Sequence, residues 1–212
     1  MNALPFSAIL LAAGNSSRMH GQFKQLLLLP TAHGDEPAVR IAAQTLLGSE
    51  PEEVVVVTGH RGGEVMAALN GLPLAFQPNP RWPEGQITSV VAGLAALRKP
   101  CSAVMICLAD LVLAQPEDYR ALARTFAKLP RDAILVPHHD GARGNPVVFA
   151  ASRVPEVISG TVNPGCRKLI ENHPDDVVKF EVGHDRFTND MDTPDDYARV
   201  HKHLASAYGC TA

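Results

Sequence analysis

Residues 8–19 read AILLAAGNSSRM, an apolar run that ends in small residues and continues into a polar segment. The run from Ala8 to Ala12 is typical of a strand that is buried on both faces. Ala13 and Gly14 would let a ligand approach the backbone closely. The amides and hydroxyls of residues 14–17 would form a concave array of donors that suits phosphate oxygens. This stretch therefore predicts a buried first strand followed by an anion-binding turn.

Two cationic side chains, Arg18 and Lys24, follow the turn. An arginine can bridge two phosphate oxygens, whereas a lysine acts as a compact point charge. Two familiar motifs do not match. The G-x-G-x-x-G fingerprint of dinucleotide-dependent oxidoreductases fails because only Gly14 lies in the turn, and a P-loop fails because Lys24 follows Phe23 instead of glycine. The residues alone leave open an ordinary connection with solvated cations.

Short apolar runs alternate with longer amphipathic segments along the chain. The alternation predicts one domain over residues 1–212, a three-layer α/β/α sandwich with a mostly parallel, Rossmann-like sheet. Ligands bind at the carboxyl ends of the strands of such a sheet. Residues 141–149 are expected to leave the sheet as an excursion. The expected strands are residues 8–12, 54–57, 74–76, 103–108 and 133–136, and the expected helices are residues 38–47, 63–69, 88–97, a segment from Pro116, and residues 194–204.

The composition excludes several classes of protein. With 46% hydrophobic and 19% charged residues the chain is expected to fold, and a net charge of -3 with 5% aromatic residues disfavours nucleic acid as a partner. The four cysteines form no C-x-x-C pair, which favours reduced thiols in a cytoplasmic protein. The apolar run at residues 8–13 is shorter than the ~20 residues that span a bilayer and follows no basic segment, so no membrane partner is expected.

Three aspartates are candidate ligands of a metal ion. Asp110 follows the apolar run 103–108, so its carboxylate would face the ligand cleft. Asp190 and Asp192 lie two apart on an extended segment and point the same way, so that one or both could reach the same cation. Mg²⁺ prefers such hard oxygen ligands together with substrate phosphates. The alternative for Asp192 is a helix cap, a role for which Thr193 competes.

These segments resemble the MobA-like NTP transferase family. The turn resembles the family signature L-A-A-G-x-S-x-R-M with a downstream lysine. Other segments resemble motifs of the molybdenum cofactor cytidylyltransferase branch, in the same order along the chain. They are TGHRG at residues 58–62, NP at 79–80 with EGQITSV at 84–90, GNPV at 144–147 and DMDTPDD at 190–196.

The resemblance implies an enzyme with the fold of nucleotide-diphospho-sugar transferases, which joins CTP and molybdopterin with Mg²⁺ and releases pyrophosphate. A molybdoenzyme or its chaperone would be the protein partner. We expect Arg18 and Lys24 to be catalytic, and Asp110, Asp190 and Asp192 to hold the metal ion. Asn145 and Pro146 would line the acceptor side. The residues expected at the nucleotide are Leu11, Ala12, Ala13, Gly14, Ser16, Ser17, Gly59, Gly85 and Ser89.

One departure from the family keeps alternatives open. The family pattern around the metal aspartate is [GA]-D-x-P, whereas this chain has Val112 where the family has proline. The nearest alternatives are guanylyl transfer to molybdopterin and cytidylyl transfer to a sugar or polyol phosphate. An alternative of another class is a non-catalytic nucleotide-binding or cofactor-chaperoning protein of the same fold.

Overall fold

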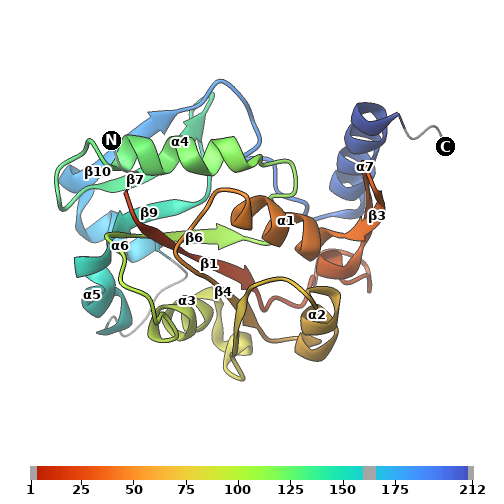
Figure 1. Cartoon of the computed structure of the whole chain (residues 1–212), viewed down its shortest axis with the longest axis horizontal. Coiled ribbons are helices and arrows are strands. Elements are labelled where there is room, and N and C mark those ends of the chain that lie inside the picture. The colour runs from red at the N-terminus through yellow and green to blue at the C-terminus, as the bar shows by residue number, and fades with distance from the viewer. Residues whose placement is uncertain (1–3, 160–165, 210–212) are drawn as a thin grey trace.

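A computed structural model describes residues 4–159 and 166–209 (Figure 1). Within these residues the main sheet has eight strands, seven of them in the order β10-β7-β9-β6-β1-β4-β5, while β8 pairs with β7. Neighbouring strands are parallel except where β9 and β8 pair. The strands are β1 (Phe6–Ala12), β4 (Val54–Thr58), β5 (Ala75–Pro78), β6 (Ala103–Leu108), β7 (Ile134–His139), β8 (Ala142–Arg143), β9 (Val147–Ala150) and β10 (Val177–Glu181).

Helices cover both faces of this sheet, so the predicted three-layer, mostly parallel α/β fold is confirmed (Figure 1). One layer contains α1 (Ala38–Leu47) and α4 (Pro116–Phe126), and α2 (Gly62–Ala68) contributes to the same core. The other layer contains α3 (Gln86–Ala95), α5 (Val154–Ser159) and α6 (Arg167–Asn172). Short 3-10 helices are η1 (Lys24–Leu26), η2 (Trp82–Glu84), η3 (Ala151–Arg153) and η4 (Pro174–Asp176).

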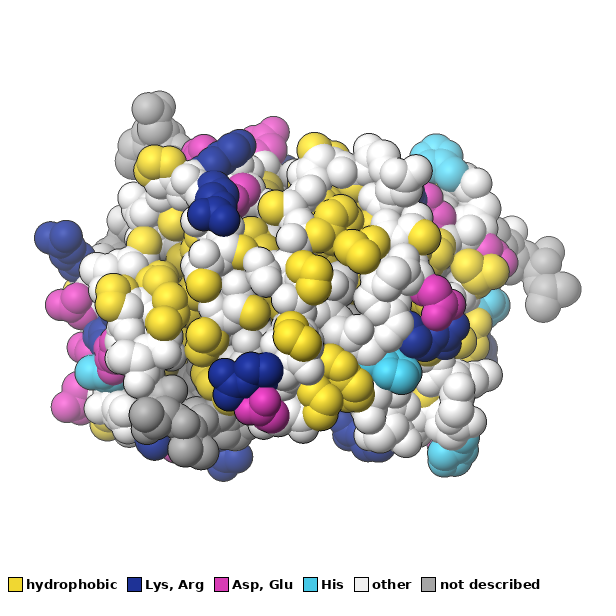
Figure 2. Space-filling view, turned by 90° about the horizontal axis from the view of Figure 1, so that it is seen from below, with side chains coloured by type: hydrophobic (Ala, Val, Ile, Leu, Met, Phe, Trp, Pro, Cys, Tyr) yellow, Lys and Arg dark blue, Asp and Glu magenta, His cyan; other side chains and the backbone are white. Residues whose placement is uncertain are grey.

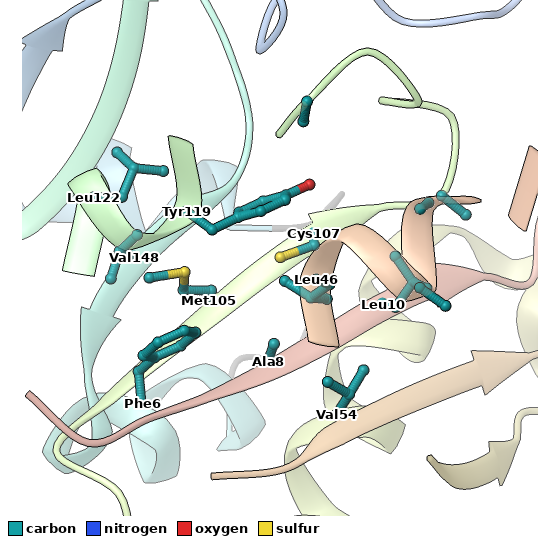
Figure 3. Close-up of a cluster of buried hydrophobic side chains, with 14 of the residues drawn as sticks. Phe6, Ala8, Leu10, Leu46, Val54, Met105, Cys107, Tyr119, Leu122 and Val148 are labelled. Carbon is teal, nitrogen blue, oxygen red and sulfur yellow. The ribbon is translucent and has the colours of Figure 1, made fainter. Parts of the chain in front are cut away.

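The apolar run of β1 lies at the centre because both of its faces are covered. Phe6, Ala8 and Leu10 point into the core under α1 and α4 (Figure 3). Ile9 and Leu11 point into the opposite core under α3. Side chains alternate between the two faces of a strand, so a strand between two helical layers must be apolar at every position.

Most predicted elements agree with the structure. The helix at residues 38–47 and the strand at 103–108 have the expected bounds, and the other predicted elements differ by small shifts or extensions at their ends. The expectation that residues 141–149 leave the sheet is wrong. Val147–Ala150 forms β9, which is fully buried and lies between β6 and β7 as an antiparallel strand.

A hairpin that was not predicted packs against the last helix. β2 (Leu28–Thr31) and β3 (Gly34–Pro37) pair in an antiparallel hairpin, and α7 (Pro194–Tyr208) lies against it (Figure 1). Leu29 of the hairpin packs with Met191 and with Val200 of α7. This packing places the segment before α7 next to the segment that follows β1.

The surface carries charges of both signs. On the face seen in Figure 2, Lys and Arg side chains lie beside Asp and Glu side chains at several places, and hydrophobic side chains are scattered between them. None of the helices in the described part of the chain combines the length and hydrophobicity that crossing a membrane requires. Cys101, Cys107 and Cys166 are free thiols, and Cys210 lies outside the described residues.

Candidate active site

A cleft of about 350 Å³ opens beyond the carboxyl ends of β1 and β6. This is where a mostly parallel sheet places its ligands. Four segments contribute to its walls: the end of β1 with the turn, the end of β6, the start of α3, and the segment before α7. The lining residues are Leu11, Ala13, Gly14, Arg18, Lys24, Gln25, Trp82, Gln86, Ser89, Leu108, Ala109, Asp110, Asp190 and Asp192.

Hydrogen bonds from η1 fix the shape of the turn after β1. The Ser16 hydroxyl accepts a hydrogen bond from the backbone amide of Lys24 at 3.0 Å and donates one to Oε1 of Gln25 at 2.9 Å. Nε2 of Gln25 donates to the carbonyl oxygen of Gly14 at 3.3 Å. Gln25 is buried and was not singled out in the sequence, because a glutamine next to a lysine carries no distinctive pattern.

Lys24 forms two ion pairs at the floor of the cleft. Its Nζ lies 2.5 Å from Oδ2 of Asp110 and 2.6 Å from Oδ1 of Asp192. Arg18 approaches from the solvent side, and its Nη2 pairs with Oδ2 of Asp192. The Lys24, Asp110 and Asp192 side chains are 14%, 11% and 17% exposed, whereas Arg18 is 67% exposed. The structure thus brings both predicted cations to the predicted carboxylates.

The three predicted aspartates form one cluster. One carboxylate oxygen from each of Asp110, Asp190 and Asp192 lies within 4.8 Å of the other two. Oδ1 of Asp110 is buried and has no hydrogen-bond partner among the described residues. The amide of Met191 donates to the backbone carbonyl of Asp110 at 3.3 Å, which holds the two segments together. An unpartnered buried oxygen beside two further carboxylates fits a hard divalent cation.

The cluster shifts the pKa values of its members. Burial lowers the pKa of Lys24, but the charges and hydrogen bonds of Asp110 and Asp192 outweigh burial and hold it above its ordinary value. Burial raises the pKa of Asp190, and the neighbouring carboxylates of Asp192 and Asp110 raise it further. Burial also acts to raise the pKa of Asp192, but its hydrogen bond with Lys24 leaves it lowered overall. Asp190 is therefore the carboxylate that most lacks a positive partner.

Asp192 does not cap the helix that follows it. Thr193 is the N-cap of α7, with its hydroxyl accepting from the amide of Asp196, and the Asp196 side chain accepts in return from the Thr193 amide. The Asp192 carboxylate is therefore left to face Lys24 and Arg18. The capping alternative for Asp192 is wrong because the neighbouring threonine fills that place.

Asn79 organises the start of α3 on one side of the cleft. Its Nδ2 donates to the hydroxyls of Thr88 at 2.9 Å and Ser89 at 3.0 Å, and its Oδ1 accepts from the amide of Arg81 at 3.0 Å. Ser89 reaches the cleft, while Gly85 lies just before α3 and outside the lining. Asn79 belongs to the NP segment quoted above, which was its only signal in the sequence.

Trp82 and Gln86 line the cleft, although neither was among the residues expected at the nucleotide. Gln86 belongs to the EGQITSV segment quoted above, whereas Trp82 belongs to none of the quoted segments. Gly59 lies beneath Trp82: a Cβ on this glycine would be 2.8 Å from both Cγ of Trp82 and the carbonyl oxygen of Ala13. The role that the structure indicates for Gly59 is therefore close packing. Ala12, Ser16 and Ser17 also lie outside the lining of the cleft.

A second cavity of about 200 Å³ adjoins the cleft, because Gln86 and Leu108 line both. Asn145 lines it together with Arg143, whereas the predicted Pro146 does not. The backbone amide of Asn145 donates to the carbonyl oxygen of Phe187 at 3.0 Å. The predicted acceptor segment thus lies next to the cleft that contains the cations and carboxylates.

Val112 occupies the position where the family pattern has proline. It is buried and packs in the same cluster as Leu113, Met191 and Val200. The substitution leaves Asp110 within the carboxylate cluster.

Curated relatives match part of this chain. The bifunctional IPC transferase and DIPP synthase of Rubrobacter xylanophilus is 37% identical over an alignment of 100 residues, and the match covers 42% of this chain and 22% of that protein. The bifunctional protein GlmU of Thermus thermophilus is 31% identical over an alignment of 121 residues, and the match covers 55% of this chain and 25% of that protein. The matched segment therefore spans about a quarter of the length of these relatives.

Solved structures share the fold over nearly the whole chain. Rv0371c from Mycobacterium tuberculosis, in complex with manganese, is 22% identical and covers 95% of this chain and 100% of its own, with a TM-score of 0.74. CMP:2-keto-3-deoxy-manno-octonic acid synthetase complexed with CTP is 16% identical, and the match covers 96% of this chain and 99% of the synthetase chain, with a TM-score of 0.73. Molybdopterin-guanine dinucleotide biosynthesis protein A from Archaeoglobus fulgidus is 18% identical, and the match covers 94% of this chain and 99% of that protein's chain, with a TM-score of 0.66.

A family model covers most of the chain. The model of the MobA-like NTP transferase domain matches residues 8–177. The matched region begins at β1 and includes the turn, Lys24, Asp110 and the start of α3. The chain therefore belongs to the family of the MobA-like NTP transferase domain.

Proposed function

We propose that the protein is a Mg²⁺-dependent cytidylyltransferase that transfers CMP from CTP to the phosphate of molybdopterin and releases pyrophosphate. The observation that carries the proposal is the contact of Lys24 with Asp110 and Asp192 in a cleft at the end of β1. Nucleotidyl transfer needs cations for the phosphates and carboxylates for a metal ion at one place. The family membership supports this class of reaction.

The chain's own residues would bind and orient the triphosphate. Gly14 and Arg18 line the cleft on the side of the turn, where the phosphates would meet a glycine backbone and a guanidinium group. An oxygen of the acceptor phosphate attacks the α-phosphorus and forms a new P–O bond. The bond to the bridging oxygen breaks, and pyrophosphate leaves with the electron pair. Lys24 would neutralise the negative charge that grows at the α-phosphate.

Asp110, Asp190 and Asp192 would hold the divalent cation. When bound, the ion would neutralise phosphate charge and align the reacting oxygens. The unpartnered Oδ1 of Asp110 supports this role, because a buried carboxylate oxygen without a donor fits a cation. The manganese in the Rv0371c complex supports a divalent ion in this family of folds.

The two cavities suggest where the other parts of the substrates would lie. The base would lie toward α3, where Trp82, Gln86 and Ser89 line the cleft, and the acceptor would lie toward Asn145. The synthetase complexed with CTP supports cytosine as the base. The Archaeoglobus protein supports molybdopterin as the acceptor but is named for guanine, so guanylyl transfer is the second candidate.

The test is incubation of the protein with Mg²⁺, molybdopterin and each nucleoside triphosphate in turn, followed by mass analysis of the product. We expect the cytosine dinucleotide and one pyrophosphate per product with CTP. A guanine dinucleotide with GTP alone would select the second candidate. Binding of nucleotide without release of pyrophosphate would contradict both and favour a non-catalytic protein.

A further inference from the structure

The cations and the carboxylates of the cleft neutralise each other in the free protein. Lys24 pairs with Asp110 and Asp192, and Arg18 also pairs with Asp192. These are the same cations that would bind phosphate and the same carboxylates that would bind a metal ion. Each ligand must therefore displace a partner that the protein already supplies.

We propose that Lys24 and Arg18 compete with a divalent cation for the carboxylates of the free protein, so that the cation and a nucleoside triphosphate strengthen each other's binding through an exchange of partners. Lys24 and Arg18 pass from the carboxylates to phosphate oxygens, while the cation takes their places on Asp110 and Asp192. The inference rests on the proposed function. It assigns Lys24 a property beyond phosphate binding: in the free protein this residue competes with the metal ion.

Burial makes the exchange unfavourable for either ligand alone. Because the Lys24 ammonium and its two partner carboxylates are mostly buried, water and salt screen them weakly. A divalent cation that arrives alone meets the ammonium of Lys24 on its ligands, and like charges repel. A triphosphate that arrives alone draws Lys24 away and leaves two carboxylates unpaired beside an anion, which is costly in a buried site. Together the two ligands supply each group with a new partner.

Asp110 has one carboxylate oxygen that a cation can bind without displacing Lys24. Its Oδ2 contacts Lys24, while its Oδ1 is buried and finds no hydrogen-bond partner in the described part of the chain. Three carboxylates face two cations in the cluster, so one negative charge is left uncompensated by these residues. The cleft can thus bind a divalent cation, but the ion pairs of Lys24 with the carboxylates limit the affinity for the cation.

The experiment measures Mn²⁺ binding to the free protein by calorimetry, without nucleotide. Compared with the wild type, Lys24→Gln should bind Mn²⁺ about tenfold more tightly, the size of a typical coupling between two sites. Arg18→Gln should tighten Mn²⁺ binding by less, because its ion pair is largely exposed. Lys128→Gln is the matched control: it removes one positive charge from an exposed position after α4, outside the cleft, and should change nothing.

Nucleotide binding should respond with the opposite sign. The probe is CTP with a methylene group in place of the α–β bridging oxygen, which the enzyme cannot split. Its binding with Mn²⁺ present is followed by the fluorescence of Trp82, the one tryptophan in the chain, which lines the cleft. Lys24→Gln should weaken this binding at least tenfold while tightening Mn²⁺ in its absence.

The proposal is overturned if a folded Lys24→Gln protein binds Mn²⁺ no more tightly than the wild type. If circular dichroism shows that Lys24→Gln is unfolded, Arg18→Gln decides, since the exposed arginine can be replaced without loss of core packing. If the wild type transfers the cytidylyl group but Lys24→Gln and Arg18→Gln bind Mn²⁺ as the wild type does, the exchange of partners is wrong and the proposed function stands. If the variants bind Mn²⁺ more tightly but the wild type transfers no cytidylyl group, the proposed function is wrong and the competition between Lys24 and the metal ion stands.

Discussion

The Nζ of Lys24 lies 2.5 Å from Oδ2 of Asp110, although 86 positions of sequence separate them. Lys24 belongs to η1 after β1, and Asp110 follows β6 by two residues. β1 and β6 are parallel neighbours, so the segments that leave their carboxyl ends meet at the same edge of the sheet. The α/β topology therefore brings together the cation proposed to bind phosphate and a carboxylate proposed to bind the metal ion.

Replacing Lys24 by alanine should lower the rate of pyrophosphate release by at least about a hundredfold. Its positive charge would stabilise the transition state, and loss of one such group typically costs that much. The fold should persist, because the ammonium lies at the cleft and not within the apolar clusters. Lys128→Ala serves as the control. An unchanged rate in Lys24→Ala would exclude the catalytic role.

Replacing Asp110 by asparagine should shift the Mg²⁺ concentration needed for half-maximal activity upward by about tenfold or more, since ligand charge sets the affinity for a hard cation. Asp140→Asn is a suitable control because that side chain is exposed and is not a member of the cluster. The measurement is the initial rate across a Mg²⁺ series. An identical Mg²⁺ dependence in Asp110→Asn and the wild type would reject this residue as a ligand.

Asp118 should make the stability of the protein depend on pH. Burial acts to raise its pKa, but two hydrogen bonds from Arg186 and one from the Gln115 amide lower it overall. A carboxyl whose pKa is lowered by folding stabilises the protein above its unfolded value, near 3.8, and loses this contribution as the pH falls through the folded value. Asp118→Asn should therefore reduce the free energy of unfolding by about 1–3 kcal/mol at pH 7.

The check is urea unfolding of the wild type and of Asp118→Asn at pH 7 and at pH 3. The difference between them should shrink at the lower pH. Glu117→Gln, on the same turn of α4, should cost less than Asp118→Asn because its ion pairs are exposed. A difference for Asp118→Asn that does not depend on pH would contradict the assignment.

Two glycine-to-alanine changes should act in opposite directions. A Cβ at Gly93 of α3 would lie 2.5 Å from Cγ2 of Ile9 and 2.9 Å from Cγ2 of Val57, so Gly93→Ala should destabilise the protein by about 1–3 kcal/mol. A Cβ at Gly63 of α2 would meet nothing within 4 Å, so Gly63→Ala should stabilise by roughly 0.5–1 kcal/mol. Thermal unfolding checks both, and equal effects would contradict the packing described for α3.

The sequence predicts the sheet centre and the cluster well, because local pattern and topology agree there. The apolar run of β1 needs burial on both faces, and the polar residues after β1 and β6 must then share an edge. β9 was missed because Val147–Ala150 is a short run and its place between β6 and β7 depends on antiparallel pairing across distant segments.

Other site residues could not be found from local pattern. Gln25 acts through hydrogen bonds that exist only once the turn has formed. Trp82 and Gln86 reach the cleft because η2 and α3 pack beside the end of β1, which a single sequence does not show. The position of Asp192 depends on the packing of α7 against the β2–β3 hairpin, which was also not predicted.

The most direct test is a crystal structure with Mn²⁺ and the methylene analogue of CTP, with the ion located by its anomalous scattering. We expect a manganese peak bound by Asp110 and by Asp190 or Asp192, with phosphate oxygens against Lys24 and Arg18. A manganese peak remote from these carboxylates, or a triphosphate outside the cleft at the end of β1, would contradict the proposed site.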